Sequence, residues 1–269
     1  MKKLLTLLLL LCCLTVVAQE QKTAILVVQF GTSNADGRKA SLDVIMSDVK
    51  TQFAQYEVRE AYSSPTIRNI LAKKGLKKDS PTDALLRLHL DGYDKVIVAP
   101  TFLLDGVEMS MLREEVKAVS SLFADVKVGN PLLYSVEDFH NVADMLTQQT
   151  LGKKEAVLYV GHGNQYASTG AYAMLGQMIR QKGNYYIGTV EGWPDRDASV
   201  DMIDKKTCKT IHVVPLLLAA GVHAREDIEE EWVPALEKKG FKVEMYLHGL
   251  GERTEFRHMF IQKIAELAK

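Results

Sequence analysis

The chain has 269 residues, of which 47% are hydrophobic and 25% are charged, proportions that indicate a globular protein and exclude a disordered or collagen-like one. The 33 Lys and Arg residues are balanced by 34 Asp and Glu residues, so no basic excess is available to neutralise phosphates. Aromatic residues make up 7% of the chain, which argues against a base-stacking surface. Nucleic acid is therefore not an expected partner.

The first 18 residues have the pattern of a secretory signal peptide. Residues 2–3 (KK) are positive, an apolar run follows, and residues 16–18 (VVA) are small or β-branched before Gln19. The apolar run covers about 14 residues, fewer than the ~20 that span a bilayer. We therefore expect cleavage before Gln19, export to the periplasm and no transmembrane segment afterwards. A lipid anchor on Cys12 or Cys13 is the less favoured alternative, because neither follows a small residue.

Short apolar runs rich in Val, Ile and Tyr alternate with longer amphipathic stretches. The expected strands cover residues 24–30, 57–62, 95–99, 126–128, 156–160, 185–190, 210–214 and 242–247. The expected helices include residues 38–56, 110–122, 172–181, 224–238 and 255–267. This alternation, with nearly continuous apolar strands, predicts an α/β fold whose parallel sheets are covered by helices on both faces.

The two halves of the chain resemble each other. Residues 96–100 (VIVAP) match residues 211–215 (IHVVP), and the match continues beyond them without a gap. Residues 30–34 (FGTSN) are aligned with residues 160–164 (VGHGN) at the end of each first strand. These matches predict an internal duplication into two similar α/β lobes. The predicted segments are a signal peptide at 1–18, an N-terminal lobe at 19–152 and a C-terminal lobe at 153–269.

Three segments at strand ends of the second half carry candidate chemistry. His162 stands between two glycines, Glu191 precedes a Gly-Trp-Pro turn, and His223 follows a strand near Gly221. Ligands of open parallel sheets bind beyond the carboxyl ends of the strands. Two imidazoles and one carboxylate at that edge would bind a divalent metal with open positions, and imidazole favours Co, Fe, Ni, Zn or Cu. The alternatives are histidines that cap helices and a glutamate satisfied within the fold.

Other features of the sequence are weaker candidates. Residues 31–34 (GTSN) resemble an anion-binding turn, but the chain lacks the glycine patterns of nucleotide-binding loops. Cys208 is the only cysteine after the signal peptide, so we expect no intramolecular disulfide and a buried structural thiol. Four histidines lack a glycine-turn context and are expected to be structural or exposed: His89, His140, His248 and His258.

The strand-end segments together resemble the anaerobic cobalt chelatases of the CbiK type, also called sirohydrochlorin cobaltochelatases. The matching segments are residues 161–164 (GHGN), 188–194 (GTVEGWP) and 215–224 (PLLLAAGVHA), and residues 28–33 (VQFGTS) resemble the first strand and turn of that family. The resemblance covers nearly all of the chain after the signal peptide. It implies a class II chelatase fold, with a tetrapyrrole cleft between the two lobes. It also implies insertion of Co²⁺, or of Fe²⁺ or Ni²⁺, into a sirohydrochlorin-like ring without an organic cofactor.

The resemblance also assigns expected roles to residues. His162, Glu191 and His223 would hold the metal, and His162 would accept protons from the ring. Glu108 falls in the first half where His223 falls in the second, and is expected to face the same cleft. The remaining candidates for contacts with the ring or its carboxylates are Thr32, Ser33, Arg38, Trp193 and Arg225.

Two features differ from the family pattern. Thr101 and Phe102 stand where a more polar, often His-containing segment is expected, and the signal peptide directs the chain out of the cytoplasm. The alternatives to a chelatase are therefore a periplasmic haem or metal carrier and a protein that releases iron from haem. Metal insertion requires a proton acceptor, whereas a haem carrier needs only an axial ligand, so the retained His162 favours catalysis. A homo-oligomer is compatible with the sequence.

Overall fold

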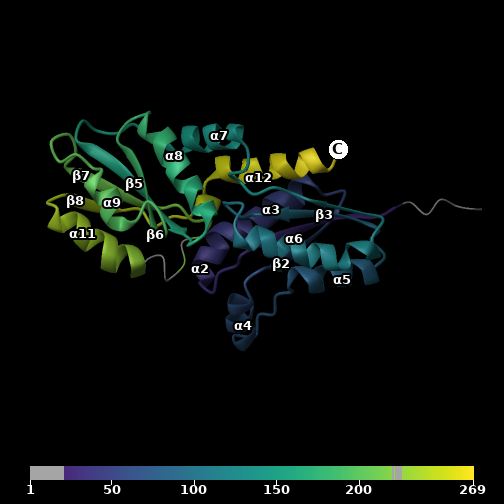
Figure 1. The fold of residues 1–269 in the computed structure, drawn as a ribbon. Helices are drawn as coiled ribbons and strands as arrows, with labels where there is room; N and C mark the ends of the chain where they lie inside the picture. The colour runs from purple at the N-terminus through teal and green to yellow at the C-terminus, as the bar shows by residue number, and fades with distance from the viewer. Residues whose placement is uncertain (1–20, 220, 222–225) are drawn as a thin grey trace, which may run out of the picture.

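The computed structural model describes residues 21–219, 221 and 226–269. Its strands form two four-stranded parallel sheets of the same order, β2-β1-β3-β4 and β6-β5-β7-β8 (Figure 1). The strands are β1 (Thr23–Gln29), β2 (Glu57–Tyr62), β3 (Lys95–Pro100), β4 (Asp125–Val128), β5 (Glu155–Gly163), β6 (Tyr185–Glu191), β7 (Thr210–Pro215) and β8 (Lys242–Met245). Each lies where the sequence predicts a strand, and the repeated order confirms the internal duplication.

Helices connect the strands. They are α2 (Ala35–Gly37), α3 (Asp43–Gln52), α4 (Pro65–Lys73), α5 (Pro81–Leu90), α6 (Val107–Val119), α7 (Val136–Leu146), α8 (Gly170–Arg180), α9 (Arg196–Asp201), α11 (Val233–Lys238) and α12 (Thr254–Leu267). Two π-helical segments, η1 (Arg38–Leu42) and η4 (Ile228–Trp232), precede α3 and α11. Short 3₁₀ turns are η2 (Ser120–Leu122), η3 (Ala167–Thr169) and η5 (Leu250–Glu252). The helix expected at 224–238 starts outside the described residues and otherwise contains η4 and α11.

Helices α4, α5, α7 and α9 are not among those that the sequence pattern predicts. Each begins with a side chain that caps the helix by accepting a backbone hydrogen bond: Ser64, Ser80, Ser135 and Asp195. Proline follows the cap in α4 and α5, where its fixed φ suits the first helical turn. The capping residue is the sequence signal that marks the start of each of these helices.

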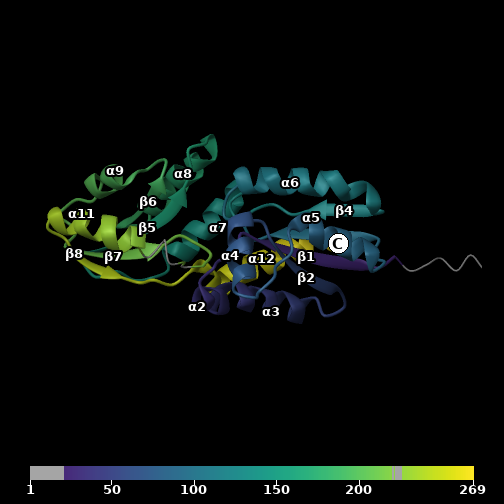
Figure 2. The ribbon, with the colours of Figure 1, turned by 90° about the horizontal axis from the view of Figure 1, so that it is seen from below.

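Three apolar layers hold the structure together. Helices α5 and α6 cover one face of the first sheet, and α9, η4 and α11 cover one face of the second. The remaining face of each sheet turns toward a shared central layer built from α3, α12, α7 and α8. Figures 1 and 2 show these helices between and beside the two sheets. One continuous core therefore joins the lobes.

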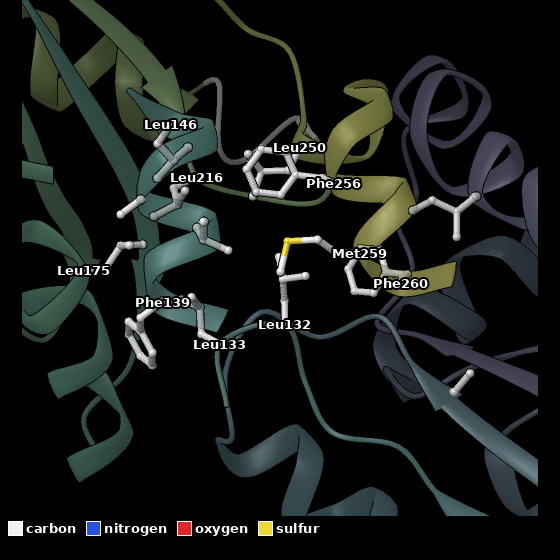
Figure 3. Close-up of a cluster of buried hydrophobic side chains, with 14 of the residues drawn as sticks. Leu132, Leu133, Phe139, Leu146, Leu175, Leu216, Leu250, Phe256, Met259 and Phe260 are labelled. Carbon is white, nitrogen blue, oxygen red and sulfur yellow. The ribbon is translucent and has the colours of Figure 1, made fainter. Parts of the chain in front are cut away.

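Two helices pack against the half of the chain to which they do not belong in sequence. Helix α7 lies against α8 of the second lobe, whereas α12 lies against α3 and β3 of the first. Side chains that meet in this layer include Leu132, Leu146, Leu216, Phe256 and Met259 (Figure 3). The strands of each sheet come from one half of the chain, but the helices are exchanged, so a division of the lobes at residue 152 stays a prediction.

Helices α7 and α12 are also joined by an ion pair. Lys263 Nζ lies 2.8 Å from Asp138 Oδ1, and both side chains are largely buried. Asp138 Oδ2 also accepts a hydrogen bond of 2.8 Å from the backbone N–H of Ser135 at the start of α7. Burial acts to raise the pKa of the Asp138 carboxyl, but the bonds from Lys263 and Ser135 outweigh it and hold the pKa below its usual value.

We expect Asp138→Asn to lower the free energy of unfolding at pH 7 by about 1–2 kcal/mol. Because the folded-state pKa is depressed, the stabilisation is complete above the unfolded-state pKa of about 3.9 and is lost as pH falls through the folded-state value. Urea unfolding at pH 7 and at pH 3 should show the difference shrinking at low pH. The control is Asp144→Asn on the same helix, since exposed Asp144 and Lys182 form a pair at 2.6 Å. Equal losses in the two variants would contradict the prediction.

Candidate functional site

The two sheets place their strand ends in equivalent positions. Val28 in β1 and Val160 in β5 each pair with the proline that ends the neighbouring strand. Gly31 and Gly163 lie three residues beyond these positions, and their φ angles are +97° and +75°, respectively. Both glycines adopt the left-handed conformation that other residues avoid. The backbone at the end of β1 is therefore repeated at the end of β5.

The sequence-based alignment of the two first strands is wrong by two residues. It matches Gly31 with Gly161, whereas the pairing of the strands matches Gly31 with Gly163 and hence Phe30 with His162. Gly161 lies inside β5, without a left-handed backbone. The two glycines around His162 look alike in sequence, and only their register against β7 distinguishes them.

Among the residues that the structure describes, only one ring nitrogen of His162 has a hydrogen-bonding partner at the end of β5. Its side chain is exposed, and Nδ1 lies 3.0 Å from the carbonyl oxygen of Gly163. A carbonyl oxygen only accepts hydrogen bonds, so this contact places the proton of the neutral ring on Nδ1. Nε2 then keeps its lone pair and is able to bind a metal ion or to accept a proton.

Glu191 ends β6 beside this histidine. It stands opposite Gly163 in the parallel pairing of β5 with β6, and its side chain is exposed. A Cβ atom on Gly163 would overlap the carbonyl oxygen of Glu191, so the close approach of the two strands requires glycine. The fold therefore brings an imidazole and a carboxylate to one edge of the second sheet, as the sequence predicts.

The predicted ligand set is placed only in part, because His223 and Arg225 lie outside the described residues. Gly221 follows β7 and lies close to the other lobe. A Cβ atom built on this glycine would be 3.7 Å from Oγ1 of Thr32. Among residues 21–219, 221 and 226–269, no three His, Cys, Asp or Glu side chains are grouped to hold a metal ion. A site with His223 as its third ligand stays a prediction.

Glu108 approaches the end of β5 from the other lobe. It is exposed in the first turn of α6, two residues after Gly106. A Cβ atom built on Gly106 would lie 3.6 Å from Oε2 of Glu108 and 4.0 Å from Nδ2 of Asn164 in the other lobe. Burial raises the pKa of Tyr172 in α8 to about 12. A hydrogen bond with the backbone of Gly163 in β5 acts to lower this pKa, whereas the negative charge of Glu108 raises it further. The neighbours of Gly106 place Glu108 close to the turn that follows the histidine-bearing strand.

The other predicted contacts with a ligand have different surroundings. Thr32 is buried and Ser33 is half-buried in the turn after β1. Arg38 Nε lies 3.4 Å from Asp43 Oδ2, so this guanidinium is paired along its own helix. Trp193 is 54% exposed just after β6. The tryptophan is thus available at the His162 edge, whereas the arginine already has a partner.

Two exposed aromatic side chains escaped the sequence interpretation. Tyr166 is 63% exposed in the turn after β5, and Phe30 is 47% exposed at the end of β1. The turns after β5 and β6 are linked, because Trp193 N donates to Thr169 Oγ1 at 3.3 Å. The signal that identifies Phe30 is the strand register, since it gives this residue the position that His162 occupies in the other lobe.

Several features lie away from the strand ends. A surface hollow of about 730 Å³ between α3 and β2 has charged side chains of both signs, Asp43, Lys50, Arg59 and Glu60. Cys208 is unpaired and fully buried, which confirms the expected structural thiol. Over the part of the chain that the structure describes, helices long and apolar enough for a bilayer are absent.

The paired sheets and their strand-end residues define a two-lobed protein with the fold of the class II chelatases. The structure of SirB from Bacillus subtilis with Fe³⁺ matches it with a TM-score of 0.66, over 92% of this chain and 96% of that chain. The sequence identity in this match is 16%, so the likeness establishes the fold.

Sequence comparison then defines the family. The family described as cobalt chelatase (CbiK) matches residues 23–269. The sirohydrochlorin cobaltochelatase of Salmonella typhimurium is 31% identical over 248 residues, 89% of this chain and 94% of that protein. The sirohydrochlorin cobaltochelatase CbiKC of Nitratidesulfovibrio vulgaris is 29% identical over 253 residues, 90% of this chain and 89% of that protein. The chain belongs to the cobalt chelatase (CbiK) family, which confirms the resemblance of its strand-end segments.

Proposed function

We propose that this protein inserts Co²⁺ into sirohydrochlorin, with Fe²⁺ and Ni²⁺ as alternative ions. Membership of the cobalt chelatase family and the names of its relatives support this activity. The observation that carries it is the exposed His162 ring, whose Nε2 is left free by the contact of Nδ1 with Gly163, beside the Glu191 carboxylate. An acceptor for protons and a ligand for the ion thus stand on adjacent strands.

The reaction exchanges one divalent ion for the protons of two pyrrole N–H groups. In our proposal Nε2 of His162 accepts a proton from the ring and passes it to solvent, then accepts the second. Glu191 and His223 hold the arriving ion while Nε2 of His162 accepts the protons, and they release the ion to the ring nitrogens. His162 is a ligand of the ion only before proton transfer begins, since its one free lone pair cannot bind metal and proton together. Two imidazoles and one carboxylate suit this task, because they leave coordination positions open.

Side chains from both lobes complete the proposal. Glu108, which reaches the end of β5, adds a second carboxylate that attracts the ion. Trp193 is exposed next to Glu191 and contacts the macrocycle. Thr32, Ser33 and Arg225 are the proposed donors to substrate carboxylates, and Arg38 joins them only by leaving Asp43.

Anaerobic incubation with sirohydrochlorin and Co²⁺, followed by absorption spectra, tests the activity. The expected result is conversion of the spectrum of the free ring to that of the cobalt complex. Wild-type protein that binds haem tightly and inserts metal into none of the tetrapyrroles tried would establish a carrier instead. Iron released from haem by the same preparation would establish the reverse reaction.

Glu191→Gln keeps the shape of the side chain and removes its charge. We expect the dissociation constant for Co²⁺ to rise at least about 10-fold, because a carboxylate ligand is lost while the fold is kept. Calorimetric titration of the metal-free protein measures this change. Cys208→Ala is the control and should bind Co²⁺ like the wild type, because the thiol is fully buried. Loss of binding in the cysteine variant but not in the glutamate variant would show that the site is misplaced.

We also propose that the protein is exported and begins at Gln19 after cleavage. The support is the short apolar segment and the VVA sequence before the cleavage point. Mass spectrometry of the protein from the periplasmic fraction should find Gln19, open or cyclised, as the first residue. A lipid adduct on Cys12 or Cys13, or an intact N-terminus in the cytoplasmic fraction, would contradict export as a cleaved protein.

A further inference from the structure

The N-terminal lobe repeats the backbone of the candidate site but not its metal ligands. The strand pairing makes Phe30 the counterpart of His162 and Ser64 the counterpart of Glu191. Ser64 is 7% exposed, and its hydroxyl caps α4 by accepting a hydrogen bond of 3.3 Å from Ile67 N. A phenyl ring and a committed hydroxyl do not bind a transition metal.

The contacts between the lobes are repeated as well. A Cβ atom built on Gly221 in the C-terminal lobe would lie 3.7 Å from Oγ1 of Thr32 in the N-terminal lobe. A Cβ atom built on Gly106 in the N-terminal lobe would lie 4.0 Å from Nδ2 of Asn164 in the C-terminal lobe. The register makes Thr32 the counterpart of Asn164, so the two contacts are related by an approximate twofold axis. Phe30 precedes one contact by two residues as His162 precedes the other. The two rings therefore flank the same boundary from opposite lobes.

From this arrangement, and resting on the function proposed above, we infer that Phe30 packs against the face of the tetrapyrrole that does not receive the metal. The phenyl ring is 47% exposed at the carboxyl end of a parallel strand, where ligands of such sheets bind. A macrocycle is flat and apolar on its faces, so it buries a phenyl ring favourably. Metal then reaches the ring only from the side of the C-terminal lobe, which carries His162 and Glu191.

The first consequence is that ring binding and metal binding respond to different residues. We expect Phe30→Ala to raise the dissociation constant for metal-free sirohydrochlorin about 10-fold, measured by fluorescence quenching. The dissociation constant for Co²⁺ without the ring should not change. Leu90→Ala is the matched control, because Leu90 is an 82% exposed apolar side chain at the end of α5. Wild-type ring affinity in Phe30→Ala would overturn the inference.

The second consequence is a new axial ligand in Phe30→His. This substitution is made together with His162→Ala, and the double variant is mixed with cobalt(II) sirohydrochlorin prepared in advance. Electron paramagnetic resonance should show nitrogen splitting on cobalt that is absent from His162→Ala alone. No added nitrogen splitting in the complex of the double variant would overturn the inference.

Neither experiment depends on turnover. If the wild type binds the ring but inserts no metal, and Phe30→Ala still weakens ring binding, the proposed function is wrong and this inference is supported. If the wild type inserts cobalt and neither Phe30 variant changes ring binding or the spectrum, the function stands and this inference is wrong.

Discussion

His162→Ala should lower the rate of cobalt insertion at least about 100-fold, since general bases contribute about 10²–10⁴-fold in rate. The substitution removes the one ring nitrogen of His162 that the contact with Gly163 leaves free, and with it the proposed acceptor for the pyrrole protons. Binding of the metal-free ring should change little, because the large surface of the macrocycle supplies most of its affinity.

The two quantities are measured on the same preparations. Absorbance follows insertion, and fluorescence quenching follows ring binding. His140→Ala is the control, because His140 is an exposed histidine on α7, away from the strand ends, and its loss should leave both unchanged. Near wild-type insertion by His162→Ala would show that His162 is not the base, and His223 would become the next candidate. Equal loss of ring binding and insertion would assign His162 to binding rather than to proton transfer.

Phe256→Ala should lower the free energy of unfolding by about 3–5 kcal/mol. Phe256 is fully buried at the start of α12, in the apolar cluster that lies between the two sheets (Figure 3). The guanidinium of Arg253 lies 4.9 Å from the centre of its ring, and this contact is lost too. Because the central layer contains residues of both lobes, the destabilisation should affect the whole molecule.

Circular dichroism and tryptophan fluorescence during urea unfolding distinguish a shared core from two independent ones. A shared core predicts that the two signals shift together in Phe256→Ala, with one transition. Leu90→Ala, on the exposed side of α5, should change the free energy of unfolding by less than about 0.5 kcal/mol. Two separate transitions, with only one moved by the substitution, would show that the lobes have separate cores.

The shared layer has a consequence for the site. Ser41 in η1 donates a hydrogen bond of 2.6 Å to the carbonyl oxygen of Leu218, just after β7, and Gly251 N donates to the same oxygen at 2.9 Å. A group from each half of the chain thus binds the segment that leaves β7. The bond from Ser41 therefore connects the segment after β7 to η1, which precedes α3 in the first lobe.

Local sequence patterns determined much of this protein. Continuous apolar runs predict the strands, because a strand buried on both faces needs apolar side chains at every position. Glycines around His162 and after Glu191 mark the turns at the carboxyl edge, because a turn with positive φ at Gly163 or Gly192 favours glycine. Segments around these turns also resemble the cobalt chelatase family. Fold class, family and the two described candidate site residues follow from features within a few residues of each other.

Only the tertiary structure decided how these parts combine. The equivalence of Phe30 with His162 depends on which residues of β1 and β5 pair with the neighbouring strand. The sequence alignment matched Gly31 with the wrong one of the two glycines around His162, and so placed Phe30 two residues away from its true counterpart. The packing of α7 on the second lobe and of α12 on the first depends on a core that joins residues such as Leu132 and Phe256. The approach of Glu108 to the end of β5 depends on contacts between the lobes. Pairing register and packing are set by contacts between residues far apart in the chain, whereas periodicity and turn chemistry act over a few residues.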